Sequence, residues 1–461
     1  MTGFYSALAQ KIDTHFACGQ TVMLWSDPGM GKTRFATETL GGRKEIHFPG
    51  MEKSGSGYVH TQVLIPASMD SGDLLGIPSL ETLTANVSAI VNSPTPYNPK
   101  TMNSIITVPD SDGNMTMRST EFATPSWALE ANSYAAEGRV LILMDEFPAM
   151  SNAGQNIMLN ILESRRLPNG FVLHPNVDII LAGNMNRSGV RGMTELTSAM
   201  TSRLAHYDMT PTLVDWTRGL SQGFGENLAD YEPVVYTPEE IERNRAKARA
   251  TVVSFLNSHP DMFNAGSAKI DRTRGWFNPR TWSKVIDVLT LSEGVDMQTR
   301  NDMVEALVGH EARTKFAAHV ETLKLPTTEQ IVRDPEILSD LDRASAFVSL
   351  TTLAAVKLNE SEGFVREYAQ KRGIDEDKAR REVVREKSAP IWDFVRVINR
   401  AGEKIDNIAI GILADNYEKI YSFAGSRLLR ANPKDANQEV LDKRFEQQQK
   451  SLVGLFQSLN K

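Results

Sequence analysis

One short segment constrains this chain more than any other. An apolar run from Thr21 to Trp25 passes into a glycine-rich loop that ends in Gly31, Lys32 and Thr33, and a helical pattern follows. A strand, a glycine-rich turn and a helix in this order predict a phosphate-binding P-loop, whose glycines turn backbone N–H groups into one concavity. Lys32 would reach the β- and γ-phosphates, and the Thr33 hydroxyl would ligate Mg²⁺. The residues predicted to bind the nucleotide here are Ser26, Asp27, Pro28, Gly29, Met30, Gly31, Lys32, Thr33 and Arg34.

Length and composition indicate a globular protein of two to four domains. The 461 residues include 41% hydrophobic and 23% charged side chains, and the net charge is −7, which argues against a chain that wraps nucleic acid along its whole length. The single cysteine, Cys18, excludes an intrachain disulfide and a cysteine-rich zinc site. The N-terminus lacks a basic region followed by an apolar core, and no stretch approaches the roughly 20 apolar residues that span a bilayer. We therefore expect a cytoplasmic protein without a membrane segment.

Strands that alternate with helices over the first 210 residues predict a doubly wound α/β fold with a parallel sheet. The apolar runs Val140–Met144 and Val177–Leu181 are typical of central strands that are buried on both faces. The stretch from Met51 to Pro125 is rich in Gly, Ser, Pro and Asn, and within it Ser104–Val108 and Asn114–Ser119 predict a hairpin. We expect three domains: an α/β nucleotide-binding domain at 1–210 with an insertion at about 51–125, a helical lid at 211–335, and a C-terminal α-helical module at 336–461.

Polar side chains follow two of these strands. In nucleotide hydrolysis, an acidic residue placed like Asp145 holds Mg²⁺, and a neighbouring carboxylate such as Glu146 orients and deprotonates the attacking water. The next strand ends in the amides Asn184 and Asn186, and either could hydrogen-bond the water or the γ-phosphate. Asn184 is the first choice and Asn186 the alternate. Ligands bind at the carboxyl ends of the strands in such sheets, so these side chains are expected beside the P-loop.

The order of these motifs resembles that of the AAA+ ATPases, and in particular the MoxR-like branch with its dynein-related and magnesium-chelatase relatives. The resemblance covers about residues 4–291. Besides the P-loop, it is carried by these stretches: Ser71–Gly76, Asp145–Pro148, the helix Gln155–Glu163, the turn Asn169-Gly170, Leu196–Leu204 and Asn278-Pro279-Arg280. Two positions depart from the family pattern. Ser26 replaces the first P-loop glycine, and Gly183-Asn184 replaces the usual Thr-x-Asn, which leaves the choice between the two asparagines open.

The resemblance also implies roles for two arginines. Arg203 would be the arginine finger, a guanidinium that stabilises the spreading charge on the γ-phosphate of a neighbouring subunit. Arg187 and Arg191 are the alternative candidates for this role. Arg280 takes the sensor-2 position just after Pro279, at a helix start where the dipole disfavours a cation unless a phosphate lies nearby.

Taken together, these features predict a ring-forming, hexameric, Mg-ATP-dependent ATPase that remodels or loads a protein client, often with a von Willebrand factor A-type adaptor. One alternative is an ATP-driven nucleic-acid motor or a subunit of a restriction-like complex. Another is a nucleotide-gated scaffold without turnover, against which the intact pair Asp145-Glu146 argues. Tyr58–His60 and the turn Asn169–Phe171 could contact a threaded substrate, although ordinary loop packing explains them at least as well.

Overall fold

The computed structural model describes residues 3–43, 45–46, 55–86, 104–106, 114–185, 195–222, 224, 235–266, 274–383 and 390–400. The chain divides into two compact units, the first made of Met1–Tyr236 with Asp261–Lys315 and the second of Thr237–Pro260 with Phe316–Lys461. The chain leaves the first unit for the helical segment Thr237–Pro260 and then returns to it. The three domain ranges expected from the sequence stay a prediction.

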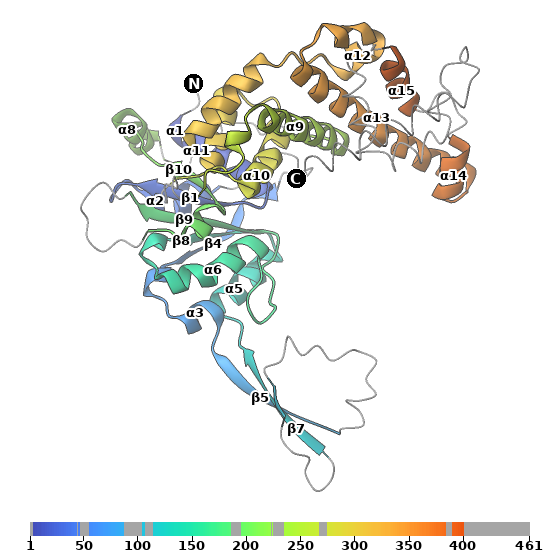
Figure 1. The fold of residues 1–461 in the computed structure, drawn as a ribbon. Helices are drawn as coiled ribbons and strands as arrows, with labels where there is room; N and C mark the ends of the chain where they lie inside the picture. The colour runs from blue at the N-terminus through green and yellow to red at the C-terminus, as the bar shows by residue number, and fades with distance from the viewer. Residues whose placement is uncertain are drawn as a thin grey trace. The chain divides into compact units, whose positions relative to one another are not determined.

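A five-stranded parallel sheet forms the framework of the first unit, in the order β10-β1-β9-β8-β4 (Figure 1). The predicted α/β class with a parallel sheet is therefore confirmed. The strands are β1 (Thr21–Ser26), β4 (Tyr58–Leu64), β8 (Arg139–Met144), β9 (Val177–Asn184) and β10 (Leu204–Asp208).

The two outer strands, β4 and β10, were not among the expected strands. β4 even lies within the range 51–125 that was expected to be an insertion. Central strands are buried on both faces and form unbroken apolar runs, whereas these edge strands include polar residues such as His60, Gln62 and His206. Polar side chains of this kind remove the apolar run by which the central strands were recognised.

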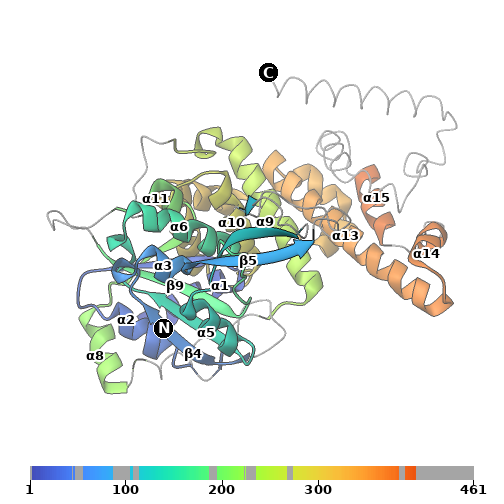
Figure 2. The ribbon, with the colours of Figure 1, turned by 90° about the horizontal axis from the view of Figure 1, so that it is seen from below.

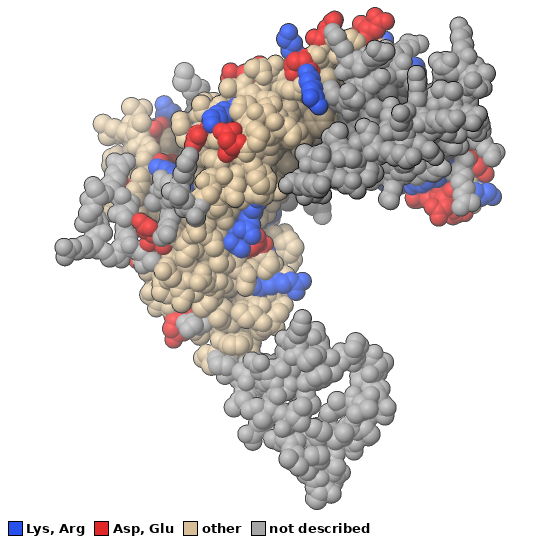
Figure 3. Space-filling model, in the orientation of Figure 1, with Lys and Arg blue, Asp and Glu red and all other residues tan. Residues whose placement is uncertain are grey.

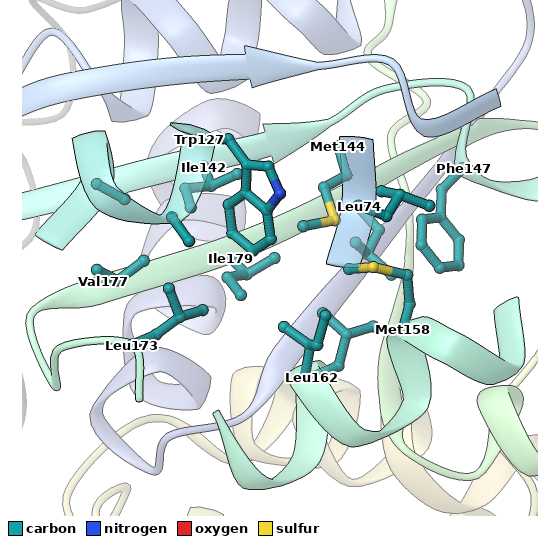
Figure 4. Close-up of a cluster of buried hydrophobic side chains, with 14 of the residues drawn as sticks. Leu74, Trp127, Ile142, Met144, Phe147, Met158, Leu162, Leu173, Val177 and Ile179 are labelled. Carbon is teal, nitrogen blue, oxygen red and sulfur yellow. The ribbon is translucent and has the colours of Figure 1, made fainter. Parts of the chain in front are cut away.

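Helices cover both faces of the sheet (Figure 1). α1 (Phe4–Ala17) and α10 (Pro279–Thr290) lie on one face, and α5 (Ser126–Ala135) and α6 (Asn152–Ser164) lie on the other. The α5 and α6 face buries an apolar cluster (Figure 4), and full burial of each large side chain in such a cluster stabilises the fold by about 1.5–3 kcal/mol. Labelled members of this cluster are Leu74, Trp127, Ile142, Met144, Phe147, Met158, Leu162, Leu173, Val177 and Ile179.

The rest of the range 51–125 includes a second, antiparallel sheet in the order β5-β7-β6. The hairpin expected over residues 104–119 is present as β6 (Ser104–Ile106) paired with β7 (Asn114–Phe122), and β5 (Pro78–Asn86) pairs with the other side of β7. The smaller elements of the first unit are α2 (Lys32–Arg34), β2 (Glu45–Ile46), β3 (Gly55–Ser56), α3 (Ser71–Leu75), α7 (Ser198–Thr201) and α8 (Leu213–Gln222).

The second unit is helical in its described residues. Its longest helix is α13 (Arg343–Arg372), along which α14 (Glu376–Val383) and α15 (Ile391–Arg400) pack (Figure 2). The other helices are α9 (Pro238–Ser258), α12 (Thr328–Arg333) and the last part of α11 (Met297–Thr322), which continues from the first unit. Among the described residues, no helix combines the length and the apolarity needed to cross a bilayer. The part of the expected C-terminal module beyond residue 400 lies outside the described residues.

Both ends of β4 are held to the sheet by hydrogen bonds outside its pairing with β8. At its start, the Tyr58 hydroxyl donates a hydrogen bond of 2.9 Å to the buried carboxylate of Asp178, which also forms an ion pair of 2.6 Å with Arg139. At its end, the Leu64 carbonyl accepts a hydrogen bond of 2.8 Å from the Asp145 N–H. These contacts fix the register of β4 against β8, since a slip of one residue would break both.

A buried histidine links α1 to β10. His15 is fully buried, with Nδ1 at 2.8 Å from Gln20 Oε1 and Nε2 at 2.7 Å from the Tyr207 hydroxyl. Burial lowers the pKa of His15 to about 4, and the nearby Lys284 ammonium lowers it further, against the opposing hydrogen bond to Gln20. The folded protein therefore holds this ring in its neutral form.

We predict that the stability of the first unit falls as pH drops from about 6.5 to about 4, by on the order of 3 kcal/mol. In this window the unfolded chain binds a proton at His15 that the folded chain does not, so acid favours unfolding. Urea unfolding followed at several pH values should show this loss in the wild type and a flatter profile in His15→Gln. His310→Gln, which removes an exposed histidine, is the control and should keep the wild-type profile. Parallel profiles for wild type and His15→Gln would contradict the assignment.

Candidate functional site

The predicted P-loop joins β1 to α2 through two glycines in the left-handed region of backbone space. Gly29 has φ 79° and Gly31 has φ 85°. A Cβ atom at either position would meet open space, so glycine is required there by the backbone conformation and not by crowding. Gly31 also caps α2, which continues directly into a π-helical turn at Phe35–Leu40. The two glycines therefore give the loop backbone conformations that other residues rarely adopt, of the kind found in phosphate cradles.

Lys32 lies within the site and not in solvent, with 8% of its surface exposed. Its ammonium group is 2.7 Å from Asn184 Oδ1 and 2.9 Å from Ser26 Oγ. Burial lowers the pKa of Lys32, and nearby carboxylates, first that of Asp145, oppose this shift. Ser26, which departs from the usual glycine, thus supplies an acceptor for the lysine. Asn184 comes from the end of β9, whereas Asn186 lies outside the described residues.

Thr33 and Asp145 also meet, although 112 positions separate them in sequence. The Thr33 hydroxyl donates a hydrogen bond of 2.6 Å to Asp145 Oδ2, and the other oxygen of this carboxylate accepts one of 2.9 Å from the Glu146 N–H. Within the described part of the chain, no three His, Cys, Asp or Glu side chains gather as a metal-binding group. A hydroxyl beside one carboxylate fits Mg²⁺, which binds few protein oxygens and takes its other ligands from phosphates and water.

Glu146 adopts a left-handed backbone conformation, φ 53° and ψ 29°, which is uncommon for a residue other than glycine and is found at functional sites. A tight turn at Phe147–Ala149 follows it, and the Ala149 N–H donates a hydrogen bond of 2.9 Å to the Glu146 carbonyl. Pro148 of this turn packs on Gly183, where a Cβ atom would lie only 2.5 Å from Pro148 Cγ. This contact explains why glycine precedes Asn184, and the turn leaves the Glu146 side of the site exposed.

Arg203 and Arg280 share one carboxylate. Arg203 Nε lies 2.6 Å from Glu163 Oε2, and Arg280 Nε lies 3.2 Å from Glu163 Oε1. Arg280 also donates a hydrogen bond of 3.4 Å to the Ser202 hydroxyl. These contacts group the predicted sensor-2 residue with the predicted arginine finger and not with Lys32. Glu163, at the end of α6, had no role in the sequence-based prediction, because only the folded chain brings it to both arginines.

Lys284 of α10 completes this cationic cluster, which we define as Arg203, Arg280 and Lys284 around Glu163. Its ammonium donates to the backbone carbonyl of Arg203. Burial lowers the pKa of Lys284 to about 8, Glu163 opposes the shift, and the two arginines add to it. Three cationic side chains therefore surround a single carboxylate.

Gln155 connects the two parts of the site. It is fully buried. Its Oε1 accepts a hydrogen bond of 2.9 Å from the Thr197 N–H at the start of α7. Its Nε2 donates hydrogen bonds of 3.3 Å to the backbone carbonyls of Met150 and Glu195. Met150 directly follows the turn after Glu146, and α7 directly precedes Arg203. In the sequence, Gln155 stands out only as part of a recurring pattern, because the hydrogen-bond partners of a buried amide cannot be assigned before the chain has folded.

Other predicted residues take positions apart from this site. Arg34 is exposed and pairs with Glu38 at 2.6 Å. Tyr58 belongs to β4, and the Asn169 side chain donates to Phe122 O and to Thr124 Oγ1, so both are structural contacts. Arg187 and Arg191, the alternates for the arginine finger, lie outside the described residues.

No protein-family model and no curated protein matches the sequence. Among solved structures, the chain is similar to a candidate ATPase from Cytophaga hutchinsonii, with 14% identity over 73% of this chain and 89% of that one and a TM-score of 0.31. It is also similar to NtrX from Brucella abortus in complex with ADP, with 14% identity over 83% and 69% and a TM-score of 0.23. NtrX in a further crystal structure matches with 13% identity over 79% and 64% and a TM-score of 0.21.

These TM-scores are too low for the neighbours to carry an inference about this chain. Its class follows from its own structure: a parallel α/β sheet with a glycine-rich loop after β1 and polar side chains at the ends of β8 and β9. The sheet and the loop together define a parallel α/β protein with a glycine-rich loop after β1.

We predict that Gly183→Ala destabilises the first unit by about 1–3 kcal/mol, because the new methyl group overlaps Pro148 and forces the turn after Glu146 to move. Urea unfolding would measure the loss. Gly3→Ala is the matched control, since the added methyl group there meets only Arg218 at 3.7 Å. Equal stability of the two variants would show that the turn does not depend on Gly183.

Proposed function

We propose that this chain is a Mg-ATP-dependent ATPase of the AAA+ class and of its MoxR-like branch, which works as a ring and remodels a protein client. The observation that carries the proposal is the meeting of the Thr33 hydroxyl with Asp145 at 2.6 Å and of the Lys32 ammonium with Asn184 at 2.7 Å. These contacts join the ends of β1, β8 and β9 at the edge of the sheet where nucleotides bind in α/β folds.

Each side chain has a distinct role in this proposal. Lys32 would exchange its contacts with Ser26 and Asn184 for the β- and γ-phosphates of ATP, and its partial burial strengthens that attraction. Thr33 and Asp145 would hold Mg²⁺. When bound, the ion would neutralise the negative charge that develops on the phosphates during hydrolysis. Glu146 would take the proton of the attacking water, and Asn184 would orient that water.

The cationic cluster supports a shared site in a ring. Arg203, Arg280 and Lys284 carry more positive charge than Glu163 neutralises, so an added anion would be attracted there. The proposal assigns this place to the γ-phosphate of ATP bound by a neighbouring subunit, with Arg203 as the finger in trans. Hydrolysis would then depend on assembly, and the motif resemblance favours a hexamer.

Charge distribution favours a protein client over nucleic acid. On the face drawn in Figure 3, the basic and acidic side chains of the described residues lie side by side, which is unlike the basic stripe that binds phosphate backbones. The net charge of −7 also favours a protein client, because an acidic chain is repelled by the phosphates of nucleic acid.

We predict that Lys32→Ala loses nucleotide binding, because the loop then lacks the cation that attracts the phosphates. Glu146→Gln should keep nucleotide binding and lose at least about 100-fold in ATP turnover, the scale of a missing general base. Binding of a fluorescent ATP analogue and phosphate release measure the two effects, with Lys315→Ala, an exposed lysine, as the control. A Glu146→Gln variant as active as wild type would rule out the assigned mechanism.

Arg203→Ala should retain nucleotide binding and assembly but lose turnover, because the finger acts across the subunit interface. When Arg203→Ala is mixed with Lys32→Ala, mixed interfaces that pair an intact P-loop with an intact Arg203 should recover part of the activity. Phosphate release and sedimentation with a slowly hydrolysed ATP analogue test this. Arg300→Ala, which removes a partly buried ion pair with Glu293, is the control. Absence of recovery, or a monomer under these conditions, contradicts the ring.

A further inference from the structure

A buried histidine holds the segment that carries the predicted arginine finger. His206 of β10 is only 5% exposed. Its Nε2 lies 3.0 Å from the backbone carbonyl of Thr201, the last residue of α7, which is five positions earlier in the chain. This hydrogen bond closes the turn between α7 and β10, and Arg203 lies within that turn.

The other ring nitrogen of His206 determines which tautomer is present. Trp25 Nε1 lies 3.0 Å from His206 Nδ1, and the two rings are stacked with an interplanar angle of 10°. An indole nitrogen can only donate a hydrogen bond, so Nδ1 is the unprotonated acceptor. Nε2 therefore carries the proton and donates the hydrogen bond to the Thr201 carbonyl. A proton on Nδ1 would face the indole N–H and break this contact.

Trp25 connects the histidine to the strand that leads into the predicted P-loop. It lies near the end of β1, and its own carbonyl accepts a hydrogen bond of 2.7 Å from the Met209 N–H just after β10. β1 and β10 are paired in parallel along this stretch. The turn that carries Arg203 is thereby fastened to β1 through the side chain of His206.

Two further contacts hold the backbone of Arg203. Its N–H donates a hydrogen bond of 2.9 Å to the Met200 carbonyl, and its carbonyl accepts one from the Lys284 ammonium. The Arg203 side chain remains 17% exposed. A group that stabilises a transition state acts only from a fixed position, and a displacement of about 1 Å can cost on the order of 100-fold in rate.

We propose that His206 is a positioning residue for Arg203: it donates to the Thr201 carbonyl and so fixes the turn from which the finger reaches a neighbouring subunit. An imidazole suits this place because it accepts from the indole and donates to the carbonyl at the same time. Burial of a polar ring costs free energy unless its nitrogens are paired, so the two contacts specify one geometry for the turn. His206 has this role only within the proposed function, in which Arg203 is the finger.

The tautomer can be measured without nucleotide, so this test does not depend on ATP turnover. The full chain is labelled with ¹⁵N at histidine, and the ring signals of the 8 histidines are recorded by two-dimensional NMR at pH 7. His206→Gln identifies the His206 signals by their loss. We expect an unprotonated Nδ1 and a protonated Nε2. The opposite tautomer, or an imidazolium ring at this pH, overturns the proposal.

Two amide variants separate the two contacts of the ring. The amide of His206→Gln ends near the position of Nε2 and keeps a donor for the Thr201 carbonyl, whereas the shorter amide of His206→Asn reaches only the position of Nδ1. Each variant loses one buried hydrogen bond, so urea unfolding should show similar losses of stability. Turnover should differ, with a loss in kcat of about 10- to 100-fold for His206→Asn and about twofold or less for His206→Gln.

Binding of a fluorescent ATP analogue should be unchanged in both variants, because neither contact touches the P-loop. His310→Asn, which removes an exposed histidine, is the control. Equal kcat values for His206→Asn and His206→Gln overturn the proposal, since a merely structural role would affect both alike.

A double-variant cycle shows whether His206 acts through Arg203. His206→Asn should lower kcat no further in the Arg203→Ala background, because the finger that it positions is already absent. A further loss of about tenfold in that background overturns the positioning role and leaves the finger assignment intact. If Arg203→Ala alone keeps wild-type turnover, the finger assignment of the proposed function fails, and the role of His206 fails with it.

Discussion

The hydrogen bond between the Thr33 hydroxyl and the Asp145 carboxylate is the contact on which the arrangement of the site depends. It joins the loop after β1 to the end of β8, and the contact of Lys32 with Asn184 adds the end of β9. A parallel sheet brings these strand ends to one edge, so residues more than 100 positions apart in sequence meet without any long connecting loop. The hydroxyl of Thr33 then lies within hydrogen-bond distance of the Asp145 carboxylate, and the ammonium of Lys32 within hydrogen-bond distance of the Asn184 amide oxygen.

From this edge, two lines of contact extend into the first unit. Through Leu64, the Asp145 backbone is tied to β4. Through Gln155, the turn after Glu146 is tied to α7 and from there to Arg203. Both lines consist of hydrogen bonds of 2.8–3.3 Å.

Departures from the family pattern have local physical reasons. Ser26 gives the Lys32 ammonium a hydroxyl acceptor at 2.9 Å, which a glycine would lack. Gly183 allows Pro148 to pack closely, and this packing supports the left-handed backbone of Glu146. The α/β class and the strands β1, β8 and β9 could be predicted, because buried parallel strands form continuous apolar runs. β4 and β10 could not, because an edge strand tolerates polar side chains and does not show such a run.

The sequence by itself determined the chemistry available to this protein: the glycines of the loop, Lys32 and Thr33 after them, and the acidic pair that ends β8. These features are local, and their backbone and side-chain requirements can be read over a few residues. Only the tertiary structure decided that Glu163 holds Arg203 and Arg280 together and that Gln155 links their segment to the turn after Glu146. Such partners are distant in sequence, and burial makes their pairing energetically necessary only after the chain has folded.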